Sequence, residues 1–393
     1  MDTTVIIGNG VAGTSAAAML RRNGYEGAIK LIGDEVALPY QRPPLSKAWL
    51  IGSDRPKPTL LRPLSFYEDN RIDLMRARKV AKIDRNKRRI RFSDGKTTKF
   101  DSLILATGAL PRRLDLQEAD LKGIYYLRDL GDAAALRQAL NNPSCHEVVI
   151  IGAGVIGLEV ASAAVDRGKT VTVVEVAARA MARVASPVTA NFVTQKLKNI
   201  GVQFLFNKKI DGLGAADHHV SSVNLGDGSQ VKADLILAGI GVIPNTELAE
   251  AAGLDCDNGI CVDQDMRTSD PKIFAIGDCA RGTNTFASGK LRMETVHNAT
   301  TQAQIAAAAI CNKERPAPVM PRFWSDLKDI KVQTVGVATG YDRVRSDASQ
   351  DPLSLEVHLK SGDRLVAAEI VNLPNRQSAL VEEISLQVSP DTR

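Results

Sequence analysis

Two glycine-rich segments of the same pattern constrain this chain more than any other feature. Gly8-Asn9-Gly10-Val11-Ala12-Gly13 follows an apolar run at residues 3–7, and Gly152-Ala153-Gly154-Val155-Ile156-Gly157 follows another at residues 147–151. In a G-x-G-x-x-G unit the first glycine permits a tight strand-to-helix turn and the second lets a pyrophosphate approach the backbone. The third lets the helix pack closely on the strand. Two such fingerprints predict two dinucleotide-binding units.

The second unit has a candidate ribose-binding carboxylate. In such units an acidic residue at the end of the second strand accepts hydrogen bonds from the adenosine ribose hydroxyls. Here a buried strand is expected at residues 170–174, and Glu175 ends it, about 20 residues after the fingerprint. A carboxylate at this point repels the 2′-phosphate of NADP, so the unit is expected to prefer NAD(H). Arg179 and Arg183 follow closely enough to oppose that preference.

The first unit offers two carboxylates for the same role. Its second strand is expected at residues 28–32, and Asp34 and Glu35 follow it. Either can bind an adenosine ribose, and Glu35 is the preferred candidate. The alternative for all these carboxylates is a solvated strand end, because charged side chains are rarely buried without a partner.

Composition predicts two or three domains and argues against nucleic-acid binding. The 393 residues are too many for one ordinary core, and 44% of them are hydrophobic. The 50 Lys and Arg residues exceed the 45 Asp and Glu residues by a formal charge of +5, which suits an acidic protein partner better than a nucleic acid. The 5 cysteines show no CxxC or His-rich metal spacing and are typical of free thiols in a reducing cytoplasm.

The apolar stretch near the start is predicted to belong to the fold. Residues 5–20 are apolar enough for a signal peptide, but Asp2 stands where a basic segment is expected, and the glycines keep the register of the first fingerprint. No run of about 18 uninterrupted apolar residues occurs, so no membrane span is predicted.

The remaining pattern predicts that the second unit interrupts the first. A proline-stiffened loop at residues 38–47 is expected to lead into a helix at Ser46. A buried strand within residues 101–108 is echoed by another within 233–239, which indicates the repeat of a whole domain. The chain then returns to the first domain through the apolar segment 272–278.

The last part of the chain is predicted to form a separate small domain. A helix is expected over residues 298–310, and Pro316 and Pro318 mark a linker. From residue 320 onward, alternating segments predict an antiparallel sheet. The expected domains are residues 1–110 with 235–315, residues 111–234, and residues 316–393.

Taken in this order, the segments resemble the two-dinucleotide flavoproteins, and more narrowly the NADH-dependent ferredoxin reductases that serve Rieske oxygenases and bacterial cytochromes P450. The resemblance covers essentially the whole chain. Its most specific segments are Arg42-Pro43-Pro44-Leu45-Ser46-Lys47, Ile156-Gly157-Leu158-Glu159, Thr268-Ser269-Asp270 to Gly277-Asp278, Arg292-Met293-Glu294-Thr295, and Phe323-Trp324-Ser325-Asp326. It implies an α/β fold with two Rossmann-like domains, as in glutathione reductase, and a small C-terminal α+β domain. The first unit would hold FAD, the inserted unit NADH, and the third domain would cover one side of the flavin.

The resemblance also implies roles for individual residues. Lys47 would lie near flavin N5 and pair with Glu159, because a fixed cation there stabilises the electron-rich reduced flavin. A surface lysine and an ordinary carboxylate in the first turn of a helix are the alternatives. Asp278 would bind the ribityl chain, and Val80 the adenine. The positions matched to FAD are Gly8, Gly10, Ala12, Gly13, Glu35, Arg42, Lys47, Val80, Ala106, Gly108, Arg128, Asp278, Val296 and Trp324. The positions matched to NADH are Gly152, Gly154, Ile156, Gly157, Glu159, Glu175, Arg183 and Gly241.

Trp324 matches a tryptophan at the electron exit of that family, and a core or interface aromatic is the alternative. His297 and Arg322 depart from the family pattern and bear on partner choice. An acidic partner is expected to dock on the basic residues near the tryptophan, for which a solvated charged face is the alternative. These residues are Arg322, Lys328, Lys331 and Arg343.

The position of the cysteines narrows the expected reaction. Disulfide reductases of this fold carry a CxxxxC pair beside the flavin, but no cysteine precedes Cys145 here. Electrons from NADH must therefore leave to an external acceptor or to oxygen. A flavin takes up two electrons together and releases them singly, as an iron–sulfur carrier requires. The chain has no cysteine set for a cluster of its own.

The expected function is thus the transfer of electrons from NADH through FAD to a [2Fe–2S] ferredoxin of an oxygenase or cytochrome P450 system. Two alternatives keep the same first half-reaction and change the acceptor to rubredoxin or to monodehydroascorbate. A third is a redox-sensing interaction protein similar to apoptosis-inducing factor.

Overall fold

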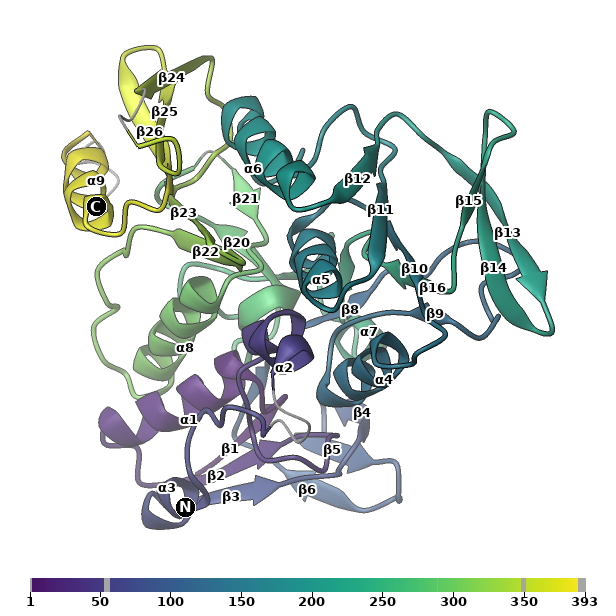
Figure 1. Cartoon of the computed structure of the whole chain (residues 1–393). Helices are drawn as coiled ribbons and strands as arrows, with labels where there is room; N and C mark the ends of the chain where they lie inside the picture. The colour runs from purple at the N-terminus through teal and green to yellow at the C-terminus, as the bar shows by residue number, and fades with distance from the viewer. Residues whose placement is uncertain (1, 53–56, 288, 348–350, 388–393) are drawn as a thin grey trace.

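The first parallel sheet is assembled from segments that lie far apart in the sequence. Its strands are β1 (Thr3–Ile7), β2 (Ala28–Ile32), β3 (Ile72–Met75), β7 (Ser102–Leu105) and β19 (Ile273–Ala275). The computed structural model, which describes residues 2–52, 57–287, 289–347 and 351–387, orders them β19-β7-β1-β2-β3. Figure 1 shows β1, β2 and β3 side by side. Strand β19 pairs in parallel with β7, so the chain returns to this sheet as predicted.

Two helices pack along each other beside this sheet. They are α1 (Val11–Arg22) and α8 (Val296–Ile310) (Figure 1). Buried alanines on both, including Ala16, Ala17 and Ala303, let the helix axes approach closely. Helix α8 begins two residues before the predicted start, because the Thr295 side chain accepts a hydrogen bond from the backbone N–H of Asn298 and caps the helix.

The second parallel sheet has the same construction and corrects one predicted boundary. Its strands are β9 (Ile124–Tyr125), β10 (Glu147–Ile151), β11 (Thr170–Val174), β12 (Val202–Leu205) and β16 (Leu235–Ala238), in the order β12-β11-β10-β16-β9. Because β16 pairs with β10, the boundary predicted after residue 234 cuts this sheet. We therefore propose that the second unit extends through residue 238. Its helices are α4 (Leu130–Leu140), α5 (Val155–Asp166) and α6 (Pro187–Asn199).

The second unit is connected to the first by two short strands that pair with each other. These are β8 (Ala109–Pro111) on the way out and β17 (Val242–Pro244) on the way back, and their pairing is antiparallel. Short sheets and helices flank the two parallel sheets. They are β4 (Val80–Asp84), β5 (Arg89–Phe92), β6 (Thr97–Lys99), β13 (Ile210–Ala216), β14 (His219–Leu225), β15 (Gln230–Lys232), β18 (Ile260–Cys261), β20 (Ala280–Thr283), β21 (Lys290–Leu291), α3 (Leu64–Asp69), α7 (Glu247–Ala251) and the 3₁₀ turn η2 (Gly277–Cys279).

The sequence predicted that the proline loop leads into a helix at Ser46, and the structure differs there. Pro43 and Pro44 begin a 3₁₀ turn, η1 (Pro43–Ser46), and the helix α2 (Ala48–Ile51) starts only after Lys47. Proline fixes φ near the value that such a turn needs, which explains its early start. Ser46 therefore does not cap a helix, and its hydroxyl is free to bond elsewhere.

The C-terminal segment forms an antiparallel sheet, as predicted. Its elements are β22 (Arg322–Leu327), β23 (Ile330–Gly336), β24 (Arg343–Asp347), β25 (Leu355–Ser361), β26 (Arg364–Val371) and the helix α9 (Arg376–Leu386). The strand order is β22-β23-β26-β25-β24, and α9 packs on β26 and β23.

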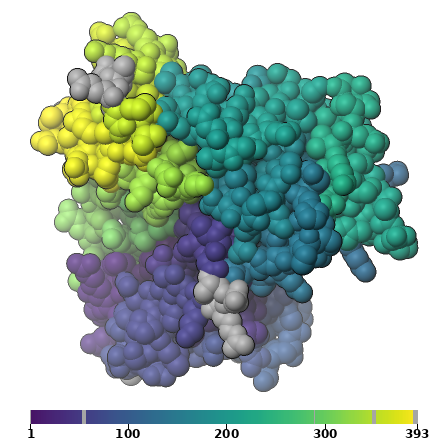
Figure 2. All heavy atoms as spheres, viewed as in Figure 1, coloured from purple at the N-terminus to yellow at the C-terminus, as the bar shows by residue number. Residues whose placement is uncertain are grey.

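One hydrophobic core continues from the second unit into the C-terminal sheet. Val148 and Leu237 of the second unit belong to the same buried cluster as Val332 and Val357 of the C-terminal sheet, and Leu50 of α2 joins it. Figure 2 shows the yellow-green C-terminal segment against the teal second unit, with purple N-terminal atoms reaching between them. Three parts of the chain therefore meet around α2. Within the described ranges, none of the helices has both the length and the apolar character that a membrane crossing demands.

Candidate active site

Both fingerprint turns leave a helix N-terminus without a side-chain cap. Helix α1 starts after Gly10 and α5 after Gly154, and neither start has a capping side chain, whereas α4, α6 and α8 each have one. The first glycines have φ values of +108° at Gly8 and +98° at Gly152. A Cβ at Gly8 would lie 2.0 Å from the carbonyl oxygen of Ala106, so only glycine fits. Unpaired N–H groups beside open backbone are suited to a pyrophosphate.

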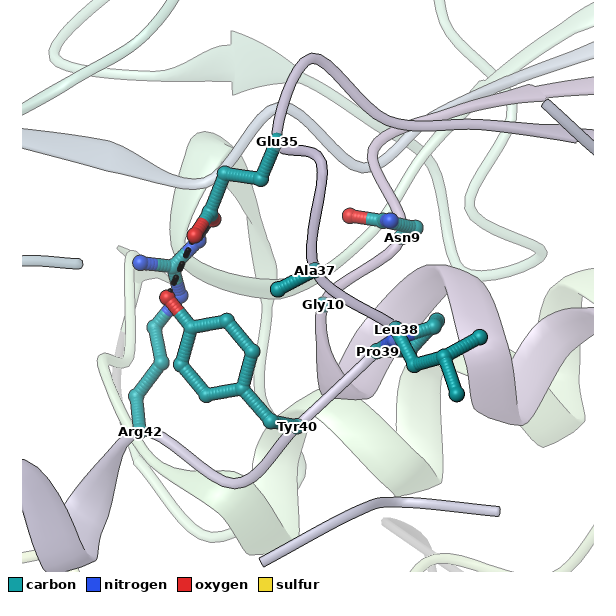
Figure 3. Close-up of a pocket in the computed structure, with 8 residues that line it drawn as sticks. All are labelled: Asn9, Gly10, Glu35, Ala37, Leu38, Pro39, Tyr40 and Arg42. Carbon is teal, nitrogen blue, oxygen red and sulfur yellow. Dashed lines mark hydrogen bonds and ion pairs between the residues drawn. The ribbon is translucent and has the colours of Figure 1, made fainter. Parts of the chain in front are cut away.

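The first unit places its ribose candidate in a pocket. Glu35 lines this pocket with Asn9 and Gly10, and its Oε1 lies 2.8 Å from Nη2 of Arg42 (Figure 3). The hydroxyl of Tyr40 donates to Glu35 Oε2 over 2.6 Å. Burial raises the pKa of Tyr40, so this hydroxyl keeps its proton and remains a donor. Asp34, the other sequence candidate, is exposed and does not line the pocket.

Contacts made by two arginine side chains connect this pocket with Asp278. Arg42 Nη1 donates to the backbone oxygen of Arg128 over 2.7 Å, and Arg128 Nη2 lies 3.1 Å from Asp278 Oδ2. The same Arg128 nitrogen lies 3.0 Å from where a Cβ of Gly108 would be, so the glycine keeps room for the guanidinium. The structure thus connects Glu35, Arg42, Arg128 and Asp278 by successive contacts.

Lys47 and Glu159 form an ion pair between the proline loop and the second unit. Lys47 Nζ lies 2.9 Å from Glu159 Oε2, and the two side chains are 19% and 2% exposed. Lys47 Nζ also donates to the carbonyl oxygen of Pro43 over 3.1 Å. The buried carboxylate accepts two more hydrogen bonds, from the hydroxyl of Ser46 and, over 2.6 Å, from that of Ser325. The pairing inferred for Lys47 and Glu159 is present, and its catalytic role remains a prediction.

Sequence reasoning missed the two serines and Tyr40. Ser46 was expected to cap a helix, and Ser325 had no expected role. Both lie inside segments that carry the family resemblance, and that position was the available signal. Tyr40 lies in the proline loop two residues before Arg42, and its pairing with Glu35 had no separate signal in the sequence.

The second unit holds its ribose candidate by backbone groups. Glu175 Oε2 accepts from the N–H of Ala153 over 2.7 Å, and Oε1 accepts from the N–H of Ala177 over 2.8 Å. The carboxylate is thereby fixed next to the fingerprint turn. Arg179 is directed to the carbonyl oxygens of its own turn. Arg183 lies beside Gly241, where an added Cβ would be 3.0 Å from Nη2.

Some of the other predicted site residues are exposed, and others are buried. Trp324 and Ile156 are 40% and 43% exposed, so both can be reached from outside. Val296 is the first residue of α8. Burial lowers the pKa of His297, the next residue, and the charge of Arg322 acts in the same direction. The buried positions are Ala12, Gly13, Val80, Ala106 and Gly157.

Two members of the predicted basic cluster already have acidic partners in the chain. Lys328 Nζ lies 2.8 Å from Asp166 Oδ1, and Arg343 Nη1 lies 3.4 Å from Asp363 Oδ1. Lys331 is exposed, and Arg322 is partly buried. The docking role of this cluster remains a prediction that now depends mainly on Arg322 and Lys331.

The thiols and possible metal ligands do not form a second reactive centre in the described part of the chain. All 5 cysteines are free. Cys279 follows Asp278 but is fully buried, and burial raises the pKa of its thiol, which disfavours a reactive thiolate. No cluster of His, Cys, Asp and Glu among the described residues could hold a metal ion.

Comparison with known proteins agrees with this geometry. Residues 2–303 match the family model of pyridine nucleotide-disulphide oxidoreductases, and residues 322–392 match the reductase C-terminal model. The chain is 46% identical over 382 residues to the rubredoxin–NAD(+) reductase of Pseudomonas putida, covering 97% of this chain and 99% of that relative. It is 38% identical over 372 residues to a ferredoxin–NAD(P)(+) reductase of Sphingomonas sp, covering 94% and 89%.

A solved structure gives the same result in three dimensions. The fold matches that of putidaredoxin reductase in its covalent complex with putidaredoxin, with a TM-score of 0.92 and 37% sequence identity, covering 99% of this chain and 96% of the other. Both fingerprints, the uncapped helix starts and the Lys47–Glu159 pair lie within the matched segments. The chain therefore belongs to the pyridine nucleotide-disulphide oxidoreductase family and is a flavoprotein oxidoreductase that uses FAD and NADH.

Proposed function

We propose that this chain passes electrons from NADH to a small iron–sulfur carrier, a [2Fe–2S] ferredoxin of an oxygenase or cytochrome P450 system. One observation carries the proposal: Lys47 of the proline loop is paired with the buried Glu159 in a part of the chain where no thiol can stand beside the flavin, because residues 1–144 contain no cysteine. The chain thus has the charged pair that supports flavin reduction but lacks the thiols of a disulfide reductase. The similar proteins named as ferredoxin, rubredoxin and putidaredoxin reductases support the same conclusion.

The residues of the chain bind the cofactors and place charge near the reacting ring. The uncapped N–H groups of α1 and α5 bind the two pyrophosphates, and Glu35 and Glu175 orient the two adenosine riboses. Asp278 accepts a hydrogen bond from the ribityl chain. Lys47, held by Glu159, keeps a positive charge where negative charge develops. Bound FAD supplies the step between a two-electron donor and a one-electron acceptor.

The position of Glu175 supports NADH as the donor. Both of its oxygens are held by backbone N–H groups, so the carboxylate cannot turn away from the ribose. A 2′-phosphate brought to this point would meet a fixed negative charge. Arg183 lies beside Gly241 and is the group that would weaken this preference.

An acidic carrier and a cytoplasmic location complete the proposal. The excess of basic residues and the exposed Lys331 near the partly exposed Trp324 favour an acidic docking surface on the carrier. The free cysteines of the described chain are those of a protein from a reducing compartment.

Rubredoxin is the second candidate acceptor. The favouring observation is the 46% identity to a rubredoxin–NAD(+) reductase of which the chain covers 99%. Both acceptors take one electron at a time, so the site around Lys47 serves either. The difference must lie in the docking surface rather than in the reaction at the flavin.

Anaerobic stopped-flow kinetics tests the proposal. The FAD-loaded protein is first reduced with NADH and is then mixed with an oxidised [2Fe–2S] ferredoxin or with rubredoxin from the same organism. Reoxidation that becomes faster with ferredoxin concentration supports the main proposal, and the same result with rubredoxin alone selects the second candidate. Reoxidation that neither carrier accelerates would instead favour the redox-sensing alternative.

A further inference from the structure

The carboxylate of Glu159 joins three parts of the chain that are far apart in sequence. It belongs to α5 of the second unit, which contacts both η1 of the proline loop and β22 of the C-terminal sheet. Oε2 accepts from Ser46 and from Lys47, and Oε1 accepts from Ser325. The bonding residues are separated by 113 positions for Ser46 and 166 positions for Ser325.

Ser325 determines how this carboxylate is turned. The side chain of Glu159 is 2% exposed, and Ser325 is fully buried, so water does not readily replace the serine hydroxyl. The bond from Ser325 Oγ to Oε1, at 2.6 Å, fixes one oxygen, and the planar carboxylate then fixes the other. That other oxygen holds Lys47. A lost hydroxyl on one side would therefore loosen the carboxylate and the lysine that it holds on the opposite side, where only Ser46 would still donate to the carboxylate beside Lys47.

The strand β22 holds Ser325 in place on its buried face. Ser325 pairs with Val332 of β23, and its side chain faces inward, while the neighbouring Trp324 is 40% exposed on the other face. Successive side chains of a strand point to opposite faces, which explains this division. The hydroxyl of Ser325 thus reaches the Lys47–Glu159 pair through Glu159.

We propose that Ser325 is a positioning residue for flavin reduction, by which the C-terminal domain fixes Glu159 and, through it, the ammonium of Lys47. The inference rests on the proposed role of Lys47. It gives the C-terminal sheet a part in the first half-reaction, in addition to any part in docking the carrier.

A second serine–glutamate contact across the same two domains provides a matched control. Glu369 of β26 is fully buried and accepts from the N–H of Ser186 over 2.7 Å and from its hydroxyl over 2.6 Å. Ser186 is also fully buried, and it precedes α6 as the N-cap, where its hydroxyl accepts from the N–H of Thr189. Ser186→Ala thus removes a comparable hydroxyl from the same interface, but at a place without contact to Lys47.

The experiment compares Ser325→Ala, Ser186→Ala, Lys47→Ala and the double variant Ser325→Ala/Lys47→Ala as FAD-loaded proteins. It measures the limiting rate of anaerobic flavin reduction by NADH, the half-saturating NADH concentration and the midpoint potential of the bound flavin. Ser325→Ala is expected to lower the limiting rate roughly three- to tenfold with the half-saturating concentration unchanged. It should also shift the midpoint potential to more negative values, because the reduced flavin loses a fixed cation. Ser186→Ala should leave the rate and the potential at wild-type values.

The double variant distinguishes a failure of this inference from a failure of the proposed role of Lys47. If Ser325 acts through Lys47, Ser325→Ala has no further effect on rate or potential once Lys47 is alanine. An equal effect in both backgrounds, or a Ser325→Ala variant that behaves as Ser186→Ala does, overturns the inference and leaves the proposed function standing. A Lys47→Ala variant with wild-type rate and potential removes the proposed role of Lys47 itself. Ser325→Cys keeps the volume with a weaker donor and carries the same test if Ser325→Ala does not fold.

Discussion

A buried carboxylate needs donors on both oxygens, because an unpaired buried charge destabilises a protein by several kcal/mol. Glu159, at 3% exposure, meets that need with Lys47 and two serines. The same contacts suit the role proposed for the pair, since a fully bonded carboxylate does not rearrange when charge changes nearby. At the scale of single residues, stability and the proposed catalytic positioning therefore have the same cause.

Lys47→Ala and Glu159→Ala should each slow flavin reduction by NADH, by roughly ten- to a hundredfold. The double variant should lose less than the product of the two effects, because the residues act as one pair. Anaerobic stopped-flow reduction measures all three. Lys30→Ala, which breaks the exposed Lys30–Asp73 pair of 3.0 Å, is the control and should have no effect. Strictly multiplicative losses would show that the two side chains act independently.

Glu175 should set the choice between the two nicotinamide cofactors. Wild-type kcat/KM for NADH should exceed that for NADPH by ~1–3 kcal/mol, roughly ten- to a hundredfold, since the fixed carboxylate repels the 2′-phosphate. Glu175→Gln should lower the ratio of kcat/KM for NADH to kcat/KM for NADPH about tenfold, because it removes that charge. Steady-state kinetics with ferricyanide as acceptor gives both values. Equal values for the wild type would mean that Arg183 binds the phosphate.

At the scale of elements, sequence patterns predicted the strands whose formation depends on neighbouring residues alone. The strands at residues 3–7, 28–32, 147–151 and 170–174 are present as β1, β2, β10 and β11, because alternation of apolar runs and glycine turns is a local property. The hydroxyl of Ser46 was misassigned because its partner, Glu159, is 113 residues away. The bond from Ser325 was invisible for the same reason. Motifs thus identified the neighbourhood of the site, and the tertiary fold decided its contacts.

The contact between β25 and α9 should depend on pH. Arg376 donates to both oxygens of Glu356 over 2.7 and 2.8 Å, and with His358 it lowers the pKa of that carboxyl from its ordinary 4.5 to about 2. A lowered folded-state pKa gives stability that is present above pH 4.5 and is lost as the pH falls toward 2. Glu356→Gln should therefore destabilise the protein by about 1–2 kcal/mol at pH 7.

Urea unfolding at pH 7, 5 and 3 measures this effect. The difference between the wild type and Glu356→Gln should shrink between pH 5 and pH 3. Arg343→Gln, which removes the exposed contact to Asp363, should show no pH-dependent difference from the wild type in the free energy of unfolding. A difference that stays constant down to pH 3 would contradict the assignment.

At the scale of the whole molecule, the proposed docking surface is shared by two domains. Trp324 and Lys331 belong to the C-terminal sheet, and Lys328, in the turn between β22 and β23, is paired with Asp166 of the second unit. Reversal of Lys328 would therefore disturb the domain interface as well as any docking. Arg322 and Lys331 are the better probes.

Arg322→Glu and Lys331→Glu should each lower the rate of ferredoxin reduction severalfold at low salt. Raising ionic strength from 0.1 to 1 M should lower the wild-type rate, because the Debye length falls from ~10 to ~3 Å. Ferricyanide reduction should change little, since it needs no docking. Lys82→Glu on β4, also exposed, is the matched control. Ferredoxin kinetics indifferent to salt and to both reversals would place the docking surface elsewhere.

The pairing of β8 with β17 marks where the chain can accept a different inserted domain. Ala109 faces Pro244 and Pro111 faces Val242, so the second unit is a long loop whose ends are already closed. Each doubling of loop length adds only ~0.6 kcal/mol of closure entropy, and a foreign insert of another size would be accepted at this junction. The obstacle lies at the opposite side, where Val148 and Leu237 share a core with Val332 and Val357. In chimeras between relatives, the insert and the C-terminal domain should be exchanged together, as one cassette.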